Sequence, residues 1–423
     1  MSLSPASVRT LYLCYFGLRE PLVQTQVLPY LRQLSAAGIK VHLLTFEARL
    51  CESWSAAELT EQRERLGAEG IAWFCLPYHK SPSVPATLYD IVAGARCAAK
   101  LVRRHKIDVL HARGHVPAMM GALVKRRTGA RLIFDIRGFM PEEYVDAGLW
   151  PAGGNVYRTV KATERWLLSM SDAFIVLTER AREILFPGRT DADVQGRPIE
   201  VIPCCVDEAR FSAAEAISRE EARLRLNVDG RRVFVYVGSF GGWYMTEEMT
   251  AFLAQAHQQD PATYSMILTQ SPPKEVVQRL RALGLNDKDF FVGKVKPEDV
   301  PQYLRAADVA ISFIKPCYSK LSSSPTKIAE YLASGLPVIC NAGVGDLDEL
   351  IENDRVGVVI SQFDSEAYGR ALKELEALSQ EESFADRCRA SARKRFSLKE
   401  LGGERYRRLY RRIFNSEQIA KEG

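Results

Sequence analysis

The stretch SSSPTKIAEYLASGLPVI, residues 322–339, carries the strongest structural signal in this chain. Ser324 suits the N-cap of a helix and Pro325 suits its first position, while Gly335 ends the helix before a short buried strand. The first amides of such a helix have no intrahelical partner and lie at the positive end of the helix dipole, which favours bound anions. The stretch therefore predicts a helix followed by a strand, with a phosphate site where the helix begins.

Polar side chains gather on one face of this predicted helix. Thr326, Lys327 and Glu330 are three or four residues apart, whereas Ile328 and Leu332 occupy the opposite, packing face. A hydroxyl, a cation and a carboxylate beside open amides suit a sugar that is carried on a nucleoside phosphate. The alternative is a surface ion pair between Lys327 and Glu330 on an ordinary helix.

This segment resembles the donor-site signature of retaining glycosyltransferases of family 4, which have the GT-B fold. In that family two glutamates bracket the signature, and the second binds the nucleotide ribose; it corresponds to Glu330. The first falls at 330 − 8 = 322, where this chain has Ser322 instead. The resemblance implies two Rossmann-like α/β domains that face each other across a cleft, with a C-terminal helix that crosses back.

The rest of the chain fits that architecture. Short apolar runs alternate with helical periods, as is typical of parallel α/β units, and the pattern restarts near residue 206. We expect an N-terminal acceptor-side domain, a C-terminal nucleotide-sugar-binding domain and a returning helix, at residues 1–205, 206–396 and 397–423. Apolar residues at helical spacing predict an amphipathic helix in the first domain, marked by Leu88, Ile91, Ala95, Ala99 and Val102.

Composition points to a cytoplasmic protein. A chain of 423 residues with 47% hydrophobic and 26% charged residues is ordinary for two globular domains. No apolar run is long enough to span a bilayer, and the first residues lack the basic region and apolar core of an export signal. Nine scattered cysteines without CxxC spacing favour reduced thiols over disulfides or a zinc site.

Positive charge is concentrated in the first half of the chain. Residues 1–190 contain 25 Lys and Arg and 17 Asp and Glu, or 25 − 17 = +8, which leaves 5 − 8 = −3 for the remainder. The basic clusters at 103–106 and 125–127 suit solvated helix ends. The alternative is peripheral contact with the inner face of an anionic membrane, but neither cluster has flanking apolar anchors.

A glycine-rich loop at 238–242 follows a predicted strand and opens a helix, so its backbone can approach a phosphate closely. The family often places an arginine and a lysine just beyond this loop, whereas this chain has Trp243 and Tyr244 there. We therefore expect Lys327, with Lys315 or Lys320, to neutralise the donor phosphate. A UDP-sugar is the expected donor and a monophosphate-activated sugar is the alternative. The predicted donor-binding residues are Gly17, Gly238, Ser239, Lys315, Lys320, Ser322, Ser324, Thr326, Lys327 and Glu330.

The acceptor side is expected where two strands of the first domain end. Family members often carry a histidine near the position of Arg137, whose paired N–H donors suit an anionic acceptor or leaving phosphate. Asp135 would orient Arg137 or accept an acceptor proton, and a buried structural pair of the two is the alternative. The predicted acceptor-side residues are His111, Arg113, Arg137 and Glu142, and the predicted catalytic residues are Arg137, Asp135 and Glu330.

We predict no metal and no cofactor beyond the nucleotide-sugar substrate. His111 and His115 are four residues apart, but Gly114 and Pro117 make a poor helix for a zinc site. The two DxD tripeptides, at 191–193 and 346–348, are read as a loop and a helix cap.

The predicted function is retaining glycosyl transfer to a small-molecule, lipid-linked or glycan acceptor, in glycan or glycoconjugate biosynthesis. We expect no nucleic-acid partner. A sugar-nucleotide 2-epimerase of the same fold is one alternative. A catalytically degenerate partner subunit is another, motivated by Ser322 and the missing Arg/Lys pair.

Overall fold

The computed structural model describes residues 8–214 and 216–422, and they form two compact units. The first unit comprises residues 1–203 and 401–423, and the second comprises residues 204–400. The first division falls after Pro203, where the sequence placed it after residue 205. The second falls after Glu400, where the sequence placed it after residue 396.

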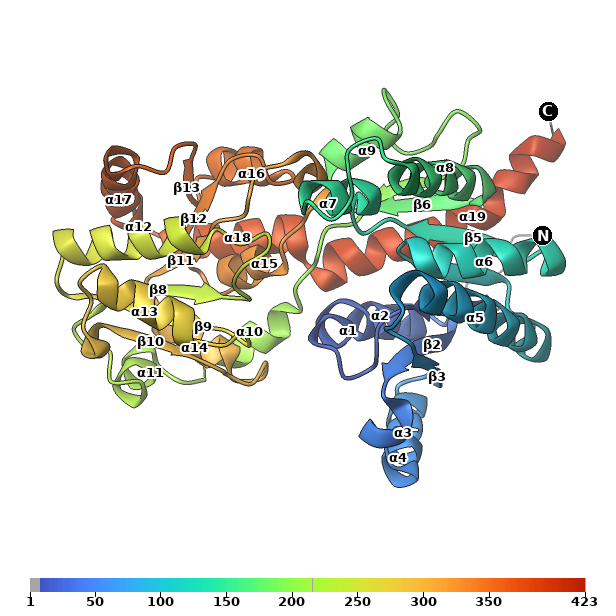
Figure 1. The fold of residues 1–423 in the computed structure, drawn as a ribbon, viewed down its shortest axis with the longest axis horizontal. Helices are drawn as coiled ribbons and strands as arrows, with labels where there is room; N and C mark the ends of the chain where they lie inside the picture. Colours follow the sequence, from blue (N-terminus) through green and yellow to red (C-terminus); the bar gives the residue numbers. More distant parts are fainter. Residues whose placement is uncertain (1–7, 215, 423) are drawn as a thin grey trace. The chain divides into compact units, whose positions relative to one another are not determined.

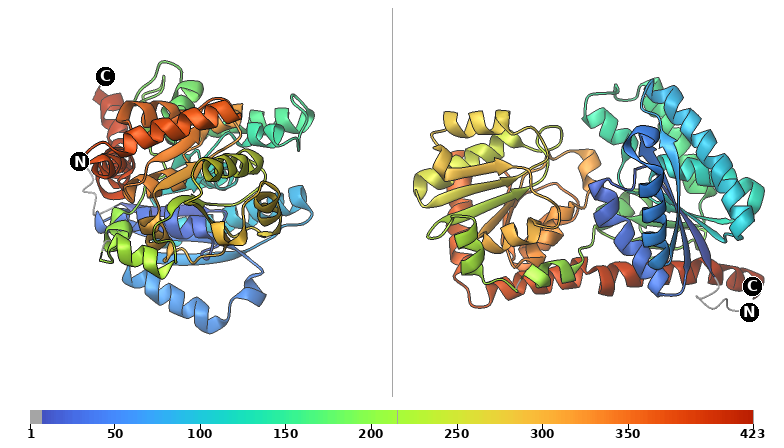
Figure 2. Two further views of the ribbon diagram at one scale, coloured as in Figure 1. Left: turned by 90° about the vertical axis from the view of Figure 1, so that its left-hand side faces the viewer. Right: turned by 90° about the horizontal axis from the view of Figure 1, so that it is seen from below.

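The first unit is built on a seven-stranded parallel sheet with the order β3-β2-β1-β4-β5-β6-β7. Its strands are largely buried, as expected for a parallel sheet covered by helices on both faces (Figures 1 and 2). The strands are β1 (Arg9–Cys14), β2 (Lys40–Ala48), β3 (Ile71–Tyr78), β4 (Val109–Arg113), β5 (Arg131–Asp135), β6 (Ala173–Val176) and β7 (Ile199–Val201). The helices are α1 (Pro21–Gln26), α2 (Leu28–Ala36), α3 (Leu50–Ser53), α4 (Ala56–Ala68), α5 (Ser83–His105), α6 (His115–Thr128), α7 (Met140–Asp146), α8 (Asn155–Met170), α9 (Glu179–Leu185) and α19 (Glu404–Glu422).

The second unit repeats this topology with a six-stranded parallel sheet in the order β10-β9-β8-β11-β12-β13. Its strands are β8 (Arg232–Val237), β9 (Thr263–Leu268), β10 (Phe290–Gly293), β11 (Val309–Ser312), β12 (Val338–Asn341) and β13 (Gly357–Ile360). Its helices are α10 (Glu208–Ala214), α11 (Arg219–Arg225), α12 (Thr246–Gln259), α13 (Lys274–Ala282), α14 (Val300–Ala306), α15 (Thr326–Ala333), α16 (Leu347–Asp354), α17 (Ser365–Ser379) and α18 (Phe384–Phe396). Short turns η2 (Asp287–Asp289) and η3 (Tyr318–Ser322) and the π-helical turn η4 (Leu398–Gly403) complete the chain.

The last helix, α19, packs on the first unit although it follows the second in the sequence (Figure 1). Tyr410 shares a hydrogen bond of 2.7 Å with Thr10 on β1, and the guanidinium of Arg408 pairs with Glu200 on β7. Tyr406 is fully buried and stacks on the ring of Tyr30 from α2. The helix therefore completes the hydrophobic core of the first unit.

The predicted strands are confirmed within a few residues, but β3, β7 and β13 were not predicted. Strand β7 has only three residues, and β13 begins with Gly357, a residue that disfavours strands. The reason for Gly357 is tertiary, because a Cβ there would lie 1.9 Å from the carbonyl oxygen of Val338 on β12.

The predicted amphipathic helix is α5, but one of its marker residues lies on the wrong face. Ile91 and Val102 are buried, whereas Leu88 is 58% exposed. Within the part of the chain that the structure describes, no helix has the length and apolarity needed to cross a membrane.

In each sheet the strand order reverses at one point, between β1 and β4 in the first unit and between β8 and β11 in the second. Ligands of doubly wound sheets bind beyond the carboxyl ends of the strands at such a point. The segments that follow β1, β8 and β11 contain the predicted residues Gly17, Gly238, Ser239, Lys315, Lys320, Ser322 and Ser324.

Candidate functional site

The helix that carries the signature, α15, begins at Thr326, one residue later than predicted. Ser324 is not its cap, because the Ser324 hydroxyl accepts a hydrogen bond of 3.0 Å from the amide of Cys204. Pro325 occupies the N-cap position without a side-chain cap bond. The amides of Thr326 and Lys327 have no hydrogen-bond partner among the described residues, so the start of α15 remains open to an anion.

Lys327 is a buried cation at this helix start. Only 6% of the residue is exposed, and Nζ has no hydrogen-bond partner among the residues that the structure describes. Nζ lies 4.2 Å from the ring centroid of Tyr236 and 4.3 Å from that of Tyr244, within cation–π range. The predicted surface ion pair is therefore wrong for Lys327, which points into the protein.

Gly238 provides the space for this ammonium group. Its φ of +152° lies in a region that L side chains rarely adopt, and a Cβ there would lie 2.6 Å from Nζ of Lys327. The backbone that follows is held in place by the Tyr236 hydroxyl, which donates a 2.6 Å hydrogen bond to the carbonyl of Ser239. The glycine loop and Lys327, 89 residues apart (327 − 238), thus form one site.

Burial, opposed by Glu330, lowers the pKa of Lys327 to about 7. A buried polar group without a hydrogen bond is unfavourable unless a ligand supplies the missing partner. A phosphate oxygen would supply both the hydrogen bond and the opposite charge. A buried lysine with a strongly lowered pKa at a helix start is typical of a functional residue.

Glu330 pairs with Arg210 rather than with Lys327. An Nη atom of Arg210 is 3.7 Å from Oε1 of Glu330, and Arg210 also donates a 2.9 Å hydrogen bond to the carbonyl of Pro297. Burial raises the pKa of Glu330, while Arg210 and Lys327 oppose the rise. The carboxylate is partly exposed and lies one helical turn beyond Lys327.

Buried side chains fix α15 to the sheet. The Tyr331 hydroxyl accepts a 2.8 Å hydrogen bond from the Val237 amide on β8 and lies 3.4 Å from the carbonyl of Ile311 on β11. The Asn341 side chain bonds both the amide and the carbonyl of Ile314 at 2.8 Å. These bonds cross the switch point, so α15 and the ends of β8, β11 and β12 move as one body.

The other predicted donor residues have different environments. Ser239 and Lys315 are exposed, whereas Lys320 is buried with Nζ 4.0 Å from the ring centroid of Trp243. Ser322 is only 2% exposed and donates its hydroxyl hydrogen to the carbonyl of Ser319 at 2.7 Å. A donor contact by the Ser322 side chain is therefore wrong for this structure, because its hydroxyl is turned into η3.

In the first unit, polar side chains converge on Asp135 at the end of β5. The Arg137 guanidinium is 3.3 Å from this carboxylate. The His111 imidazole and the Arg113 guanidinium are each 3.7 Å from it, measured to the nearest nitrogen. The hydroxyls of Tyr12 and Tyr406 both lie 3.4 Å from Oδ2. Asp135 is fully buried.

Asp135 is a structural anion rather than a general base. Burial would raise its pKa, but Arg137, the His111 hydrogen bond and Arg113 outweigh that effect and hold the pKa well below its usual range. A fully buried carboxylate with a lowered pKa neither reaches an acceptor nor takes its proton. The predicted proton-accepting role is therefore wrong, and Asp135 is a positioning residue for Arg137.

His111 also has no access to an acceptor. The residue is fully buried, its Nδ1 is 3.0 Å from the Tyr410 hydroxyl, and its ring stacks near that of Tyr406. Burial lowers its pKa despite the neighbouring Asp135, so the imidazole is neutral at pH 7. Its predicted acceptor-side role is wrong because α19 covers it.

Arg113 is a buried cation of the Asp135 cluster. It is 5% exposed, and its Nη1 atom has no hydrogen-bond partner among the described residues. A buried charged donor without an acceptor is unfavourable, so an anionic ligand that reaches Arg113 would be stabilised there.

The two remaining predicted residues of the first unit, Glu142 and Gly17, both lie against other side chains. Glu142 is 8% exposed and is engaged by Lys161 at 2.8 Å and by the Tyr157 hydroxyl at 3.0 Å, which indicates a structural role. Gly17 lies against Glu47, whose Oε2 would be 2.8 Å from a Cβ at position 17. Burial raises the pKa of Glu47.

The predicted metal alternatives find no support in the geometry. His111 faces Tyr410, whereas Nε2 of His115 is 2.9 Å from Glu164, so the two histidines have separate partners. Asp193 is bonded to Arg197. Across residues 8–214 and 216–422, no three His, Cys, Asp or Glu side chains are placed to hold a metal ion.

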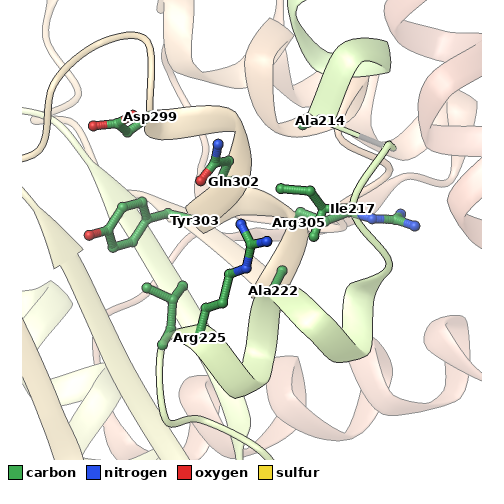
Figure 3. Close-up of a pocket in the computed structure, with 9 residues that line it drawn as sticks. Ala214, Ile217, Ala222, Arg225, Asp299, Gln302, Tyr303 and Arg305 are labelled. Carbon is green, nitrogen blue, oxygen red and sulfur yellow. The ribbon is translucent and has the colours of Figure 1, made fainter.

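A pocket of about 270 Å³ lies elsewhere in the second unit (Figure 3). It lies between α11, α14 and the segment that follows α10, and none of its lining residues belongs to the predicted donor site. The lining residues are Ala214, Ile217, Ala222, Arg225, Leu226, Asp299, Gln302, Tyr303 and Arg305.

Sequence reasoning missed the residues that make Lys327 unusual. Tyr236 lies inside a strand and Tyr244 in a loop, and nothing in their spacing links them to a lysine more than eighty residues later. Arg210 was also missed, although it lies in a short helix after the domain boundary. Only the fold brings these residues together.

Solved structures with the same architecture identify the fold. Sucrose-phosphate synthase from Thermosynechococcus elongatus aligns with a TM-score of 0.70 at 16% identity, over 96% of this chain and 100% of that one. Anabaena Alr3699/HepE in complex with UDP and glucose aligns with a TM-score of 0.64 at 15% identity, over 98% and 99% of the two chains. At such identities the likeness shows the fold alone, and the predicted GT-B fold is confirmed.

The family comparisons then define the class. Residues 23–210 match the model described as Glycosyltransferase Family 4, and residues 218–395 match the model described as Glycosyl transferases group 1. Both matching models describe glycosyltransferases, and the fold is GT-B. A curated relative, D-inositol 3-phosphate glycosyltransferase from Salinispora tropica, is 25% identical over 306 residues. The match covers 69% of this chain and 61% of that relative, so the chain spans less than two thirds of the relative's length.

Proposed function

We propose that this protein transfers a sugar, with retention, from a nucleotide-sugar donor that binds the second unit to an acceptor that binds the first. The observation that carries the proposal is Lys327, whose buried ammonium group lacks a hydrogen-bond partner among the described residues and faces the Gly238 loop. A diphosphate would accept hydrogen bonds from Lys327 and from the first amides of α15. Preorganised donors of this kind stabilise the charge that develops on the leaving phosphate.

A UDP-sugar is the proposed donor. Alr3699/HepE, which shares the fold, was solved with UDP and glucose. Glu330 would hold the ribose, with Arg210 keeping its carboxylate in place. Lys315, which is exposed, and Lys320 would add positive potential near the phosphates, so catalysis would require no metal.

The proposed acceptor carries an anionic group. Nη1 of Arg113 has no hydrogen-bond partner among the described residues, and a phosphate or carboxylate oxygen would supply one. The relative from Salinispora tropica is named for D-inositol 3-phosphate, which is an acceptor of this chemical type.

A panel of nucleotides tests the donor proposal by thermal shift. We expect UDP and UDP-sugars to raise Tm in a concentration-dependent way, because a ligand that binds only the folded state stabilises it. If a different nucleotide raises Tm instead, the donor carries the base of that nucleotide and not that of UDP. If no nucleotide raises Tm, the protein does not bind a nucleotide-sugar donor and the degenerate-subunit alternative holds.

Replacing Glu330 by Ala is expected to raise the donor KM by about tenfold or more, because a hydrogen bond to a charged group is worth about 1.5–3 kcal/mol. The fold should persist, since the carboxylate is partly exposed. Steady-state kinetics with a UDP-sugar measures the effect. The exposed acid Glu374 on α17 provides the control, and a Glu330→Ala enzyme with wild-type KM would reject the ribose assignment.

Replacing Arg137 by Ala is expected to lower kcat/KM for an anionic acceptor by about tenfold to a hundredfold, while donor binding stays unchanged. Isothermal titration with UDP measures donor binding, and initial rates with the acceptor measure the loss. Replacing Arg137 by Lys should restore only part of the rate, because Lys lacks the paired N–H donors. Equal losses with charged and uncharged acceptors would contradict an anion-binding role.

A further inference from the structure

One helix of the first unit presents an apolar ridge outward. Along α5, Val84, Leu88 and Val92 recur at every fourth position and are 64%, 58% and 42% exposed. Residues with this spacing form a single ridge along a helix. Tyr89, beside Leu88, is 62% exposed. Three aliphatic side chains and one aromatic ring thus project from the same end of α5.

The same ridge becomes basic toward the end of the helix. Arg96, Lys100 and Arg104 continue the four-residue repeat and are exposed, and none has an ion-pair partner in the described part of the chain. Exposed Lys80, Arg103 and Lys106 flank the helix. From Val84 to Arg104 the ridge is about 30 Å long, and it winds by about 200° around the helix because each four-residue step adds about 40° to a full turn. Its middle part, Leu88, Val92, Arg96 and Lys100, lies within about 120° and faces one side.

No exposed acid opposes these cations on α5. The one acidic residue of the helix, Asp90, is fully buried and accepts hydrogen bonds from the Tyr15 hydroxyl at 2.7 Å and from the His79 amide at 3.0 Å. Two other exposed arginines of this unit, Arg19 and Arg32, are paired with Glu58 and Glu69. The ridge of α5 is therefore both apolar and uniformly positive.

The opposite face of α5 holds the helix rigidly on the unit. Figure 1 shows α5 beside α6, and the two helices pack along their length. At Gly94, a Cβ would lie 2.6 Å from Sδ of Met120 on α6 and 2.9 Å from the ring of Phe46 on β2. Because this face is closely packed, the exposed ridge does not turn inward to bury its apolar residues.

We propose that the α5 ridge docks on a lipid bilayer that contains anionic phospholipids. Leu88 and Val92 would enter the interfacial region, with Tyr89 at headgroup depth. Arg96 and Lys100 would contact the phosphate groups, where basic side chains are attracted to the negative surface potential. The basic clusters at 103–106 and 125–127 have no flanking apolar anchors in the sequence, which favoured solvated helix ends and left membrane contact as the alternative. The ridge supplies those anchors one to five turns earlier on the same helix.

A bilayer fits this surface better than an acidic protein does. The aliphatic side chains project from a convex helix, and a fluid interface accepts them without a complementary pocket. The length of the basic row also suits an extended charged plane rather than a single acidic side chain.

Sedimentation with phosphatidylcholine vesicles, with and without phosphatidylglycerol, tests the proposal. We expect the wild-type chain to bind only the vesicles with phosphatidylglycerol and to be released by high salt, which screens exposed charges. Two variants change the ridge in different ways, Leu88→Ser/Val92→Ser and Arg96→Gln/Lys100→Gln. Each is expected to lower the partition coefficient by about tenfold or more.

Matched controls change the second unit instead. Leu224→Ser/Leu283→Ser removes two exposed leucines, 61% and 39% exposed, and Lys274→Gln/Lys373→Gln removes two exposed lysines. Both controls should bind vesicles like the wild type, and all variants should keep the wild-type Tm and UDP response. Because the ridge is exposed, its two variants are expected to fold.

Three results would overturn the proposal. They are wild-type binding that is equal with and without phosphatidylglycerol, ridge variants that bind like the wild type, and no vesicle binding at all. The last result would favour an acidic protein as the occupant of the ridge. None of them affects the donor proposal, which the nucleotide panel tests separately.

Discussion

Replacing Lys327 by Met is expected to lower kcat/KM for the donor by about 10²–10³, the loss typical of removing one preorganised donor from a developing anion. Nζ is the cation that lies between the Gly238 loop and the start of α15, and it has no other hydrogen-bond partner among the described residues. Methionine keeps most of the side-chain volume between Tyr236 and Tyr244 while it removes the charge. Initial rates over a range of UDP-sugar concentrations measure the effect.

The same replacement is expected to stabilise the fold. An unpaired buried amine is unfavourable, so Lys327→Met should raise the free energy of unfolding by about 1 kcal/mol or more, measured by urea denaturation. Loss of activity together with a gain in stability separates a ligand-binding lysine from a structural one. The exposed Lys373 on α17 is the control, and Lys373→Met should change neither quantity.

Replacing Lys327 by Arg is not expected to restore activity. A guanidinium is larger than an ammonium group, and the space beside Gly238 is so small that even a Cβ at that glycine would lie 2.6 Å from Nζ. An Arg variant with wild-type kinetics would show that positive charge alone, without this enclosure, is sufficient.

Lys327 also gives donor binding a pH dependence. Burial, opposed by Glu330, lowers its pKa to about 7, and the protonated form binds phosphate. Donor affinity is therefore expected to fall as pH rises above 7. The stability effect has the opposite sign: an unfolded lysine with a pKa of 10.5 binds more protons than the folded one between pH 7 and 10.5. The unfavourable contribution of Lys327 is thus present in full below pH 7 and decreases as pH rises through that window.

Replacing Asp135 by Ala is expected to lower the free energy of unfolding by about 3–5 kcal/mol, the loss typical of removing one partner from a buried ion pair. The carboxylate is an anion that both Arg113 and Arg137 face, and it also accepts hydrogen bonds from Tyr12 and Tyr406. Its loss would remove a buried counterion that the two guanidinium groups share. Urea denaturation measures the change.

A matched variant tests whether burial is the cause. Asp287 pairs with Arg281 on the surface, and Asp287→Ala is expected to leave Tm unchanged, since exposed ion pairs contribute little. Asp135→Asn should be milder than Asp135→Ala because it keeps an acceptor oxygen. Equal stability of Asp135→Ala and the wild type would show that this buried carboxylate does not stabilise the folded state.

The Asp135 contribution should depend on pH in the direction opposite to that of Lys327. Its pKa in the folded state is held below that of an ordinary carboxyl group by Arg137, His111 and Arg113, which together outweigh burial. The stabilisation is therefore present above the ordinary carboxyl pKa and is lost as pH falls below it. Acid denaturation of Asp135→Ala should consequently be less steep than that of the wild type.

The sequence alone determined the fold class and the local elements on which the proposed donor site is built. Apolar runs that alternate with helical periods predict parallel sheets because strands covered on both faces must be apolar throughout. Helix starts, glycine turns and the strand after Gly335 are local features, and local backbone preferences encode them. The helix at Thr326, the loop at Gly238 and the two-unit organisation were therefore predictable.

The tertiary structure decided which of the predicted residues are exposed and which are paired. Ser322 and His111 are buried, Ser324 bonds Cys204 instead of capping α15, and Glu330 pairs with Arg210. Leu88 lies on the solvent-exposed ridge of α5, although its spacing from Ile91 fits the packing face. The spacing of apolar residues shows which residues share one side of a helix. It does not show how much of the helix circumference is covered by neighbouring elements.

The electrostatic state of the site also required the fold. Burial lowers the pKa of Lys327, and the groups packed around its ammonium include Tyr236, Tyr244 and Gly238, which lie more than eighty residues earlier in the chain. Charge, hydrogen bonding and desolvation depend on distances in space, and residue spacing within one segment carries no information about them. The sequence identified Lys327 as a candidate site residue. Only the packed structure makes it a buried cation without a counterion.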